Sequence, residues 1–282
     1  MTILSDISLK PYNTFNIGVN AKHFVSVKSV AELQTVLKLE NYPEKFILGG
    51  GSNMLLTKDI EALVIHLNLK GIEIMSQNNS EVKIKAFAGE NWHEFVLWCL
   101  EHNFGGIENL SLIPGNIGTA PIQNIGAYGV ELKDVFESCE ALHISSENIK
   151  TFTRADCNFD YRNSIFKQEV KGEFIILSVI LTLSVANHSV KTGYGAISDE
   201  LNRLFINKPT IQDVSKAVIN IRTSKLPNPK IIGNCGSFFK NPIVSMPQFE
   251  ILKSNFPQIP NYIISDSEVK IPAGWLIQHA GF

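Results

Sequence analysis

The chain has 282 residues, of which 44% are hydrophobic and 18% are charged, a composition that excludes an intrinsically disordered protein. Its 25 Lys and Arg residues nearly balance its 27 Asp and Glu residues, and a formal net charge of −2 argues against a broadly basic nucleic-acid-binding protein. At ~150 residues per domain, this length predicts about two domains, with room for a small third one.

The sequence predicts neither a secretory leader nor a membrane-spanning helix. Residues 1–6 lack a basic stretch that leads into an apolar one. The longest apolar run, Phe174–Val185, is much shorter than the roughly 20 residues that a spanning helix needs, so we expect a buried strand there. The four cysteines show no paired spacing, which predicts reduced thiols, no metal site and a cytoplasmic protein.

Strand-like and helical patterns alternate along the chain. Apolar alternation or short apolar runs predict strands at residues 23–27, 46–48, 63–67, 82–86, 135–142 and 174–183. Apolar residues at helical spacing predict helices at residues 30–37, 90–102, 211–221, 246–255 and 271–279. The first of these helices begins with a capping-box pattern, Ser29 with Glu32 three positions on, and Pro272 is expected in the first turn of the last.

The composition changes near Pro227 and, less sharply, near Lys70. These changes predict an N-terminal α+β subdomain at residues 1–70, a second subdomain at residues 71–221 and a third domain at residues 222–282.

A glycine triplet follows the strand at residues 46–48. Glycine lets the backbone approach a ligand closely and adopt positive φ, and successive N–H groups can bind an anion. Ser52 and Asn53, directly after Gly49-Gly50-Gly51, add donors for phosphate oxygens. The pattern is neither GxGxxG nor GxxxxGK[ST], so it indicates neither a Rossmann turn nor a P-loop. A tight turn between strands explains it equally well.

A second stretch rich in glycine and proline runs from Ile113 to Gly129. Most connections between elements have about 4–6 residues, so a stretch of this length indicates more than a simple link. Together with the first glycine cluster it could hold both phosphates of a large nucleotide cofactor. A purely structural loop is the alternative interpretation.

Two further segments carry candidate catalytic side chains. Arg162, next to Tyr161, offers a permanently charged fork for a carboxylate, although such a pair is also common on protein surfaces. Ser237 follows Gly236 and could donate a proton if nearby cations lower its pKa. No GxSxG elbow surrounds it, which disfavours a hydrolase nucleophile and leaves a plain glycine-rich turn as the alternative.

Several motifs in the chain are similar, in order, to those of one family. They are Asn13–Ile17, Leu48–Leu56, Gly106–Gly129, Asp160–Lys167, Arg222–Lys230 and Gly233–Pro242. Together they resemble the MurB family, the UDP-N-acetylenolpyruvoylglucosamine reductases of bacterial peptidoglycan synthesis, from Pro11 through Phe282. The segment Thr192–Gly195 resembles the type with an extra tyrosine loop.

This resemblance implies an α+β protein with an FAD-binding fold of the vanillyl-alcohol-oxidase type and a smaller substrate-binding α/β domain. The FAD-binding residues it implies are Gly49, Gly50, Gly51, Ser52, Asn53, Pro114, Gly115, Gly118, Gln123, Asn124 and Gly126. NADPH would reduce the flavin, and the flavin would pass a hydride to C3 of the enolpyruvyl ether of a UDP-sugar.

The same resemblance implies roles for the candidate side chains. Arg162 would polarise the substrate carboxylate, where negative charge develops, and Ser237 would donate the proton to C2. Tyr161 would help shape the site. The residues that match contacts to the UDP-sugar are Tyr194, Lys225 and Asn241. The implied enzyme is a monomeric UDP-N-acetylmuramate dehydrogenase with no nucleic-acid or membrane partner.

The family pattern continues beyond Ala273–Ile277 and includes a glutamate that assists the serine, so an incomplete member of the family is expected. An inactive or partner-dependent flavin-binding fragment is therefore one alternative. Another is a different FAD oxidoreductase of the same fold, such as a carbohydrate oxidase. That class attaches its flavin through a His or Cys inside the glycine-rich loops, whereas Cys99 and His102 precede the second loop.

Overall fold

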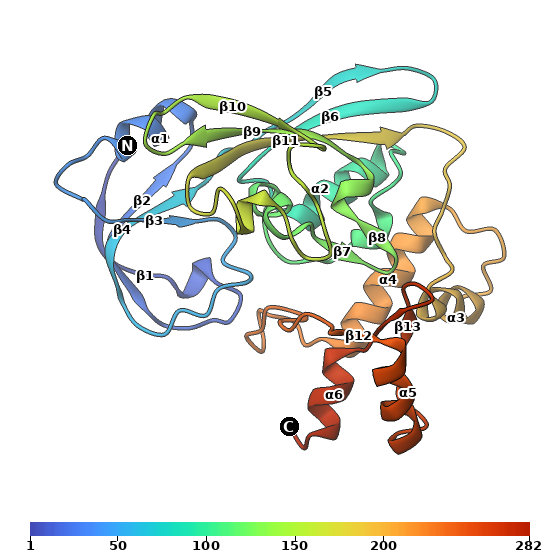
Figure 1. The fold of residues 1–282 in the computed structure, drawn as a ribbon. Helices are drawn as coiled ribbons and strands as arrows, with labels where there is room; N and C mark the ends of the chain where they lie inside the picture. The colour runs from blue at the N-terminus through green and yellow to red at the C-terminus, as the bar shows by residue number, and fades with distance from the viewer. The chain divides into compact units, whose positions relative to one another are not determined.

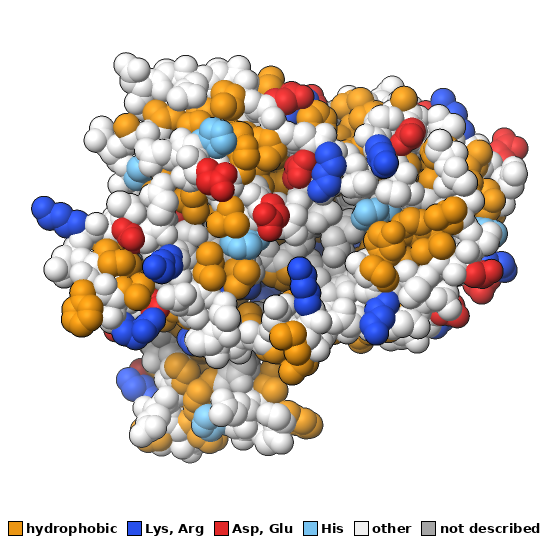
Figure 2. All heavy atoms as spheres, turned by 180° about the vertical axis from the view of Figure 1, so that it is seen from behind, with side chains coloured by type: hydrophobic (Ala, Val, Ile, Leu, Met, Phe, Trp, Pro, Cys, Tyr) orange, Lys and Arg blue, Asp and Glu red, His pale blue; other side chains and the backbone are white. Residues whose placement is uncertain are grey.

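The computed structural model describes residues 1–282, except for the solvent exposure of Gly195. The chain comprises two units, Met1–Cys235 and Gly236–Phe282. Within the described residues, no helix combines the length and the apolar character needed to cross a membrane. On the face shown in Figure 2, Lys and Arg side chains are interspersed with Asp and Glu side chains, as the near-balanced composition predicts.

The first unit begins with a four-stranded sheet (Figure 1). Its strands, in spatial order, are β1 (Leu4–Ser8), β2 (Asn20–Val27), β4 (Ile60–Leu67) and β3 (Lys45–Leu48). β1 pairs antiparallel with β2, whereas β4 pairs parallel with both β2 and β3. Parallel strands need a crossover connection, and α1 (Val30–Leu37) supplies it between β2 and β3.

The N-terminus of α1 shows one half of the predicted capping box. Ser29 Oγ accepts the backbone N–H of Glu32 at 3.1 Å. The carboxylate of Glu32, however, accepts the backbone N–H of Lys28 at 2.7 Å instead of that of Ser29. Both bonds satisfy donors at the start of the helix, so the expected boundary holds although the reciprocal partner differs.

A five-stranded antiparallel sheet forms the centre of the first unit. Its strands, in spatial order, are β10 (Ile149–Thr153), β9 (Phe136–His143), β11 (Phe174–Ser184), β6 (Glu81–Phe87) and β5 (Ile72–Gln77). β11 is buried along most of its length and has apolar layers on both faces. This burial explains why its sequence is a continuous apolar run, and it confirms the predicted buried strand.

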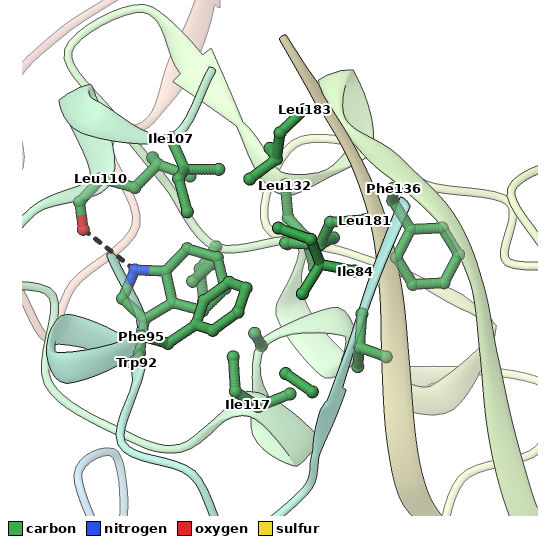
Figure 3. Packing of buried hydrophobic residues seen from close by; sticks show 14 of the residues in the cluster. Ile84, Trp92, Phe95, Ile107, Leu110, Ile117, Leu132, Phe136, Leu181 and Leu183 are labelled. Carbon is green, nitrogen blue, oxygen red and sulfur yellow. Dashed lines mark hydrogen bonds between the residues drawn. The ribbon is translucent and has the colours of Figure 1, made fainter. Parts of the chain in front are cut away.

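One face of this sheet packs on α2 (Trp92–Glu101) around large side chains that are almost fully buried (Figure 3). Trp92 and Phe95 are each 1% exposed, and the indole Nε1 of Trp92 donates to the carbonyl of Leu110 at 2.9 Å. Side chains from β6 and β11, including Ile84 and Leu181, complete this core. The opposite face packs against the first sheet and α1.

The remainder of the first unit consists of short elements and two helices. The short elements are β7 (Gly126–Ala127), β8 (Val130–Glu131) and the 3-10 turns η1 (Lys10–Tyr12), η2 (Glu108–Leu110), η3 (Ile117–Thr119), η4 (Pro121–Gln123), η5 (Leu132–Asp134) and η6 (Ile165–Lys167). The helices are α3 (Gly195–Arg203) and α4 (Ile211–Lys225), and they pack on each other through apolar residues such as Leu201 and Val218.

The second unit has a three-stranded antiparallel sheet, in the order β12 (Ile243–Ser245), β14 (Glu268–Lys270) and β13 (Tyr262–Ile263). Its helices are α5 (Met246–Asn255) and α6 (Ala273–His279), both of which the apolar spacing predicts. Pro272 is the N-cap of α6 and so precedes the first turn in which we expected it. A small core forms around Phe249, Ile259, Val269 and Ile271.

All four cysteines are free and buried. Burial raises the pKa of the Cys99 thiol far above its ordinary value. The pKa of Cys139 is raised as well, first by a hydrogen bond with Cys157 and second by burial. These thiols therefore stay protonated and pack as small apolar side chains.

Thr210→Ala should lower the free energy of unfolding by ~1 kcal/mol, because it removes the N-cap of α4. Thr210 Oγ1 accepts the N–H of Asp213 at 3.2 Å, and the Asp213 carboxylate accepts the N–H of Thr210 at 2.9 Å. Urea denaturation followed by circular dichroism measures the change. Thr210→Ser keeps the hydroxyl and should leave the midpoint nearly unchanged; equal midpoints for both variants would refute the capping role.

Candidate functional site

The two glycine-rich loops lie against each other. Ser52 Oγ donates to the carbonyl of Pro114 at 3.2 Å. The Asn53 amide donates to Gln123 Oε1 at 3.0 Å. Loops more than sixty positions apart in sequence are thereby joined, and the structure brings together the candidate cofactor-binding residues of both.

The glycines in these loops are required by close packing. A Cβ on Gly50 would lie 2.8 Å from Asn116 Oδ1 and 3.0 Å from the Cα of Gly115. A Cβ on Gly49 would lie 2.7 Å from the side chain of Thr119. Gly115 has a φ of +121°, a conformation that side-chain-bearing residues rarely adopt. The glycine pattern therefore reflects loop-to-loop contact, in addition to the turn between strands that the sequence predicts.

The segment Asn13–Ile17 supports the first loop. The buried Asn13 amide donates to the carbonyls of Leu9 and Ile17 at 2.8 and 3.1 Å, and its Oδ1 accepts the N–H of Ile17 at 3.0 Å. One asparagine thus closes this turn upon itself. The N–H of Thr14 then donates to the carbonyl of Gly51 at 3.2 Å, which fixes the turn to the glycine triplet.

The segment that follows α4 contacts the turn at Asn13–Ile17. The Asn16 amide donates to the carbonyl of Pro229 at 2.5 Å, and the N–H of Asn234 donates to the carbonyl of Thr14 at 2.8 Å. Motifs from the beginning and from the last third of the sequence therefore meet within the first unit.

Arg162 is held against the backbone of the second glycine-rich loop. Its guanidinium donates to the carbonyl of Asn124 at 3.3 Å and to that of Gly126, and it lies 4.0 Å from a carboxylate oxygen of Glu131. Its backbone has a φ of +54°, which is uncommon for a non-glycine residue and often marks a functional position. Its guanidinium also lies 5.4 Å from the ring centre of Tyr161. A permanently charged fork is thus fixed beside the loop.

Asn124 joins the second loop to the segment that carries Arg162. It is buried and has a left-handed backbone with a φ of +44°. Its amide donates to a carboxylate oxygen of Glu131 at 3.1 Å and to the carbonyl of Asp160 at 3.0 Å, and its Oδ1 accepts the N–H of Lys133 at 3.0 Å. This network links the loop and Arg162 into one site.

Arg222, on α4, adds a second cation. Burial lowers its pKa from the ordinary value, and its interaction with Tyr128 opposes that shift. Its Nε is buried and has no hydrogen-bond partner among the described residues, and the same is true of Thr14 Oγ1. The ring of Tyr194 lies edge-on to that of Tyr128, with 5.5 Å between the ring centres. The candidate substrate residue Tyr194 thus lies beside the second loop.

Three predicted site residues remain. Lys225 lies exposed in the last turn of α4. Ser237 and Asn241 belong to the second unit, where Ser237 is exposed. Asn241 Oδ1 accepts the N–H of Ala273 at 2.9 Å, so this side chain positions the start of α6. These two residues are therefore built on a different unit from Arg162.

Sequence reasoning missed Glu131 and Asn109. The buried Asn109 amide donates to the carbonyls of Tyr128 and Lys191, at 3.0 and 2.8 Å, and so joins the second loop to the segment before Tyr194. Its partners are backbone atoms distant in sequence, which no local pattern could reveal. Glu131 could have been proposed from the sequence, because its carboxylate closely follows the glycine-rich stretch.

Comparison with known proteins identifies the family. A family model described as an FAD binding domain matches residues 21–150, which include both glycine-rich loops. A UDP-N-acetylenolpyruvoylglucosamine reductase from Flavobacterium johnsoniae is 58% identical over 282 residues, which cover 100% of this chain and 84% of that protein. The chain belongs to this reductase family. Another family member, from Amoebophilus asiaticus, is 46% identical over 284 residues, again 100% of this chain and 84% of that protein.

A solved reductase of this family confirms the fold. The crystal structure of MurB from Thermus caldophilus has a TM-score of 0.61 at 21% sequence identity, and the match covers 96% of this chain and 88% of that one. The predicted α+β fold of the vanillyl-alcohol-oxidase type, with its FAD-binding domain, is therefore confirmed.

FAD is the cofactor of this chain, which belongs to the reductase family. The residues that the structure places beside the two loops fit this cofactor. Polar atoms of Thr14 and Arg222 are buried without partners among the described residues, and such atoms favour a ligand that satisfies them.

Gly50→Ala should weaken FAD binding roughly tenfold or more, because overpacking in a close contact costs about 1–3 kcal/mol. Its added Cβ would press on backbone and side-chain atoms of the second loop. Fluorescence titration with FAD measures the affinity. Gly18→Ala is the matched control, since a Cβ there meets nothing within 4 Å. Equal affinities for the two variants would show that FAD binding does not depend on the loop contact.

Proposed function

We propose that this chain reduces the enolpyruvyl ether of UDP-N-acetylglucosamine to UDP-N-acetylmuramate for peptidoglycan precursor synthesis, with NADPH as the reductant. The observation that carries this proposal is the 58% identity, over the whole of this chain, to a UDP-N-acetylenolpyruvoylglucosamine reductase. When bound, the flavin supplies the hydride that reaches C3 of the enolpyruvyl group.

In this proposal the two loops hold the FAD pyrophosphate and its neighbouring groups. Backbone N–H groups of a glycine-rich loop can surround phosphate oxygens where no Cβ intervenes. The proposed ligands are Gly49, Gly50, Gly51, Ser52, Asn53, Pro114, Gly115, Gly118, Gln123, Asn124 and Gly126. The hydrogen bonds from Ser52 to Pro114 and from Asn53 to Gln123 support this grouping, since they place both loops at one site.

Arg162 is proposed to bind the carboxylate of the enolpyruvyl group. Hydride addition at C3 places negative charge on C2, and this charge spreads into the conjugated carboxylate. A fixed guanidinium stabilises that charge more in the transition state than in the ground state. The bonds to the carbonyls of Asn124 and Gly126 support this role, because they hold the fork in place before substrate arrives. Tyr161 would shape the same site.

Ser237 is proposed to donate the proton that C2 requires. Its exposure on the second unit and its place after Gly236, which has a φ of +70°, support a hydroxyl presented to substrate. Tyr194, Lys225 and Asn241 are proposed to contact the UDP-sugar. The edge-on contact of Tyr194 with Tyr128 supports the first of these assignments.

The same proposal includes a cytoplasmic monomer without a nucleic-acid or membrane partner. It divides the chain into FAD-binding subdomains at residues 1–70 and 71–221 and a substrate-binding domain at residues 222–282. The near-neutral charge supports the absence of a nucleic-acid partner, and the free cysteines support a cytoplasmic location.

Ser237→Ala should abolish formation of UDP-N-acetylmuramate yet leave reduction of the flavin by NADPH largely intact, because the proton at C2 is needed only in the second half-reaction. Stopped-flow absorbance of the flavin and product assay measure the two halves separately. Ser254→Ala, an exposed serine of the same unit, is the control and should change neither. If the Ser237 variant also loses flavin reduction, the proposed role is wrong.

Arg162→Lys should lower kcat roughly 10²-fold, because an ammonium keeps the charge but cannot contact two carbonyls and a carboxylate as a planar fork does. Steady-state kinetics with the enolpyruvyl substrate measures the loss. Arg203→Lys, which alters an exposed Arg–Glu pair on α3, should retain kcat. A similar kcat in both variants would exclude transition-state stabilisation by Arg162.

A further inference from the structure

The second glycine-rich loop is fastened along its first part to the start of α2. The indole Nε1 of Trp92 donates to the carbonyl of Leu110, as Figure 3 shows, and the N–H of Trp92 donates to the carbonyl of Gly115 at 3.0 Å. The loop returns two bonds, from the N–H of Ile117 to the carbonyl of Glu90 at 2.9 Å and from the N–H of Gly118 to that of Ala88 at 3.0 Å. Residues 88–93 thus form a support for residues 110–118.

One bond in this series has a titratable acceptor. The N–H of Leu112 donates to the imidazole Nδ1 of His93 at 3.0 Å. Leu112 has a φ of +59°, which is costly for a leucine and persists where surrounding contacts impose it. The backbone enters the glycine-rich loop directly after this strained residue, at Ile113 and Pro114.

We propose that His93 is a positioning residue for the FAD site: its unprotonated Nδ1 holds Leu112 in the left-handed conformation from which the second loop approaches the first. This inference rests on the proposed FAD-binding role of that loop. His93 acts through Leu112 and has no contact with the reacting atoms in this account. Loss of the bond would release the strained entrance and move Pro114 and Gly115 away from Ser52 and Gly50, which they contact.

The surroundings of His93 keep it unprotonated at neutral pH. Burial lowers its pKa below the ordinary value of 6.5, the guanidinium of Arg222 on α4 lowers it further, and Glu94 on its own helix opposes both. Protonation would place an N–H at Nδ1, where it would face the N–H of Leu112. Because the folded-state pKa is lowered, the stabilisation by neutral His93 is fully present above pH 6.5 and is lost as the pH falls below it.

Three variants of the full chain test this role. His93→Ala removes the acceptor, whereas His93→Asn offers an amide oxygen near the position of Nδ1 that does not titrate. His102→Ala is the control, because His102 is an exposed histidine that also precedes the second loop in the sequence. The readouts are the hydrogen exchange rate of the Leu112 amide without added FAD and the FAD dissociation constant, each from pH 5 to pH 8.

We expect His93→Ala to speed exchange at Leu112 and to weaken FAD binding by about fivefold, the loss of one hydrogen bond of ~1 kcal/mol. His93→Asn should restore both values at pH 7.5. Below pH 6.5 it should also remove the rise in the dissociation constant and the loss of protection of the Leu112 amide, the latter taken relative to the exchange rate of an unprotected amide at the same pH. Unchanged exchange and affinity in His93→Ala, or failure of Asn to restore either, would overturn the inference. If the unaltered chain bound no FAD, the proposed cofactor site would fail, and the exchange rates would still decide whether His93 holds Leu112.

Discussion

Backbone-to-backbone approach of two distant loops is the constraint on which the site depends. Atoms of Gly50 and Gly115 lie so close that no side chain fits between them, and Ser52 and Asn53 hydrogen-bond across the contact. Backbone atoms of both loops are thus brought together without side chains in between. The remaining architecture of the first unit serves to deliver these two loops to one place.

The first loop follows a strand of the four-stranded sheet, whereas the second loop follows α2 and η2. β3, which lies parallel to β4 and β2, leads directly into the glycine triplet. The core between α2 and the five-stranded sheet supports the second loop. Trp92 belongs both to that core and to the bonds that hold the loop. The packing of the core and the position of the second loop therefore share residues, and a change that loosens this core also disturbs the loop.

Long or strongly patterned elements could be predicted from the sequence. β11 has an apolar run that only a buried strand of its length explains, and α4 combines helical spacing with a capping box at Thr210. β5 and β10 were missed because most of their side chains are exposed, so no set of buried apolar residues marks either strand. α3 was missed because its sequence is largely polar and its N-cap, Tyr194, makes no side-chain capping bond.

The site was predictable as a set of residue types and not as a geometry. Glycine spacing indicated an anion-binding backbone, and the resemblance of the ordered motifs assigned it to FAD. The left-handed conformations of Asn124 and Arg162 were not predictable, because tertiary bonds to Asp160, Gly126 and Glu131 impose them. Likewise, the hydrogen bond from the N–H of Leu112 to His93 was not predictable, because no local sequence pattern links these two segments.

The burial of the four cysteines has a practical consequence. Cys99, Cys139 and Cys157 have no exposed surface, and burial raises the pKa of Cys235, which is 9% exposed. Little native thiolate is therefore present to react with a maleimide at neutral pH. A cysteine introduced at an exposed position of either unit would therefore take up a fluorescent label selectively, without removal of any native cysteine. Pairs of such labels could report the distance between the two units in solution, with and without nucleotide.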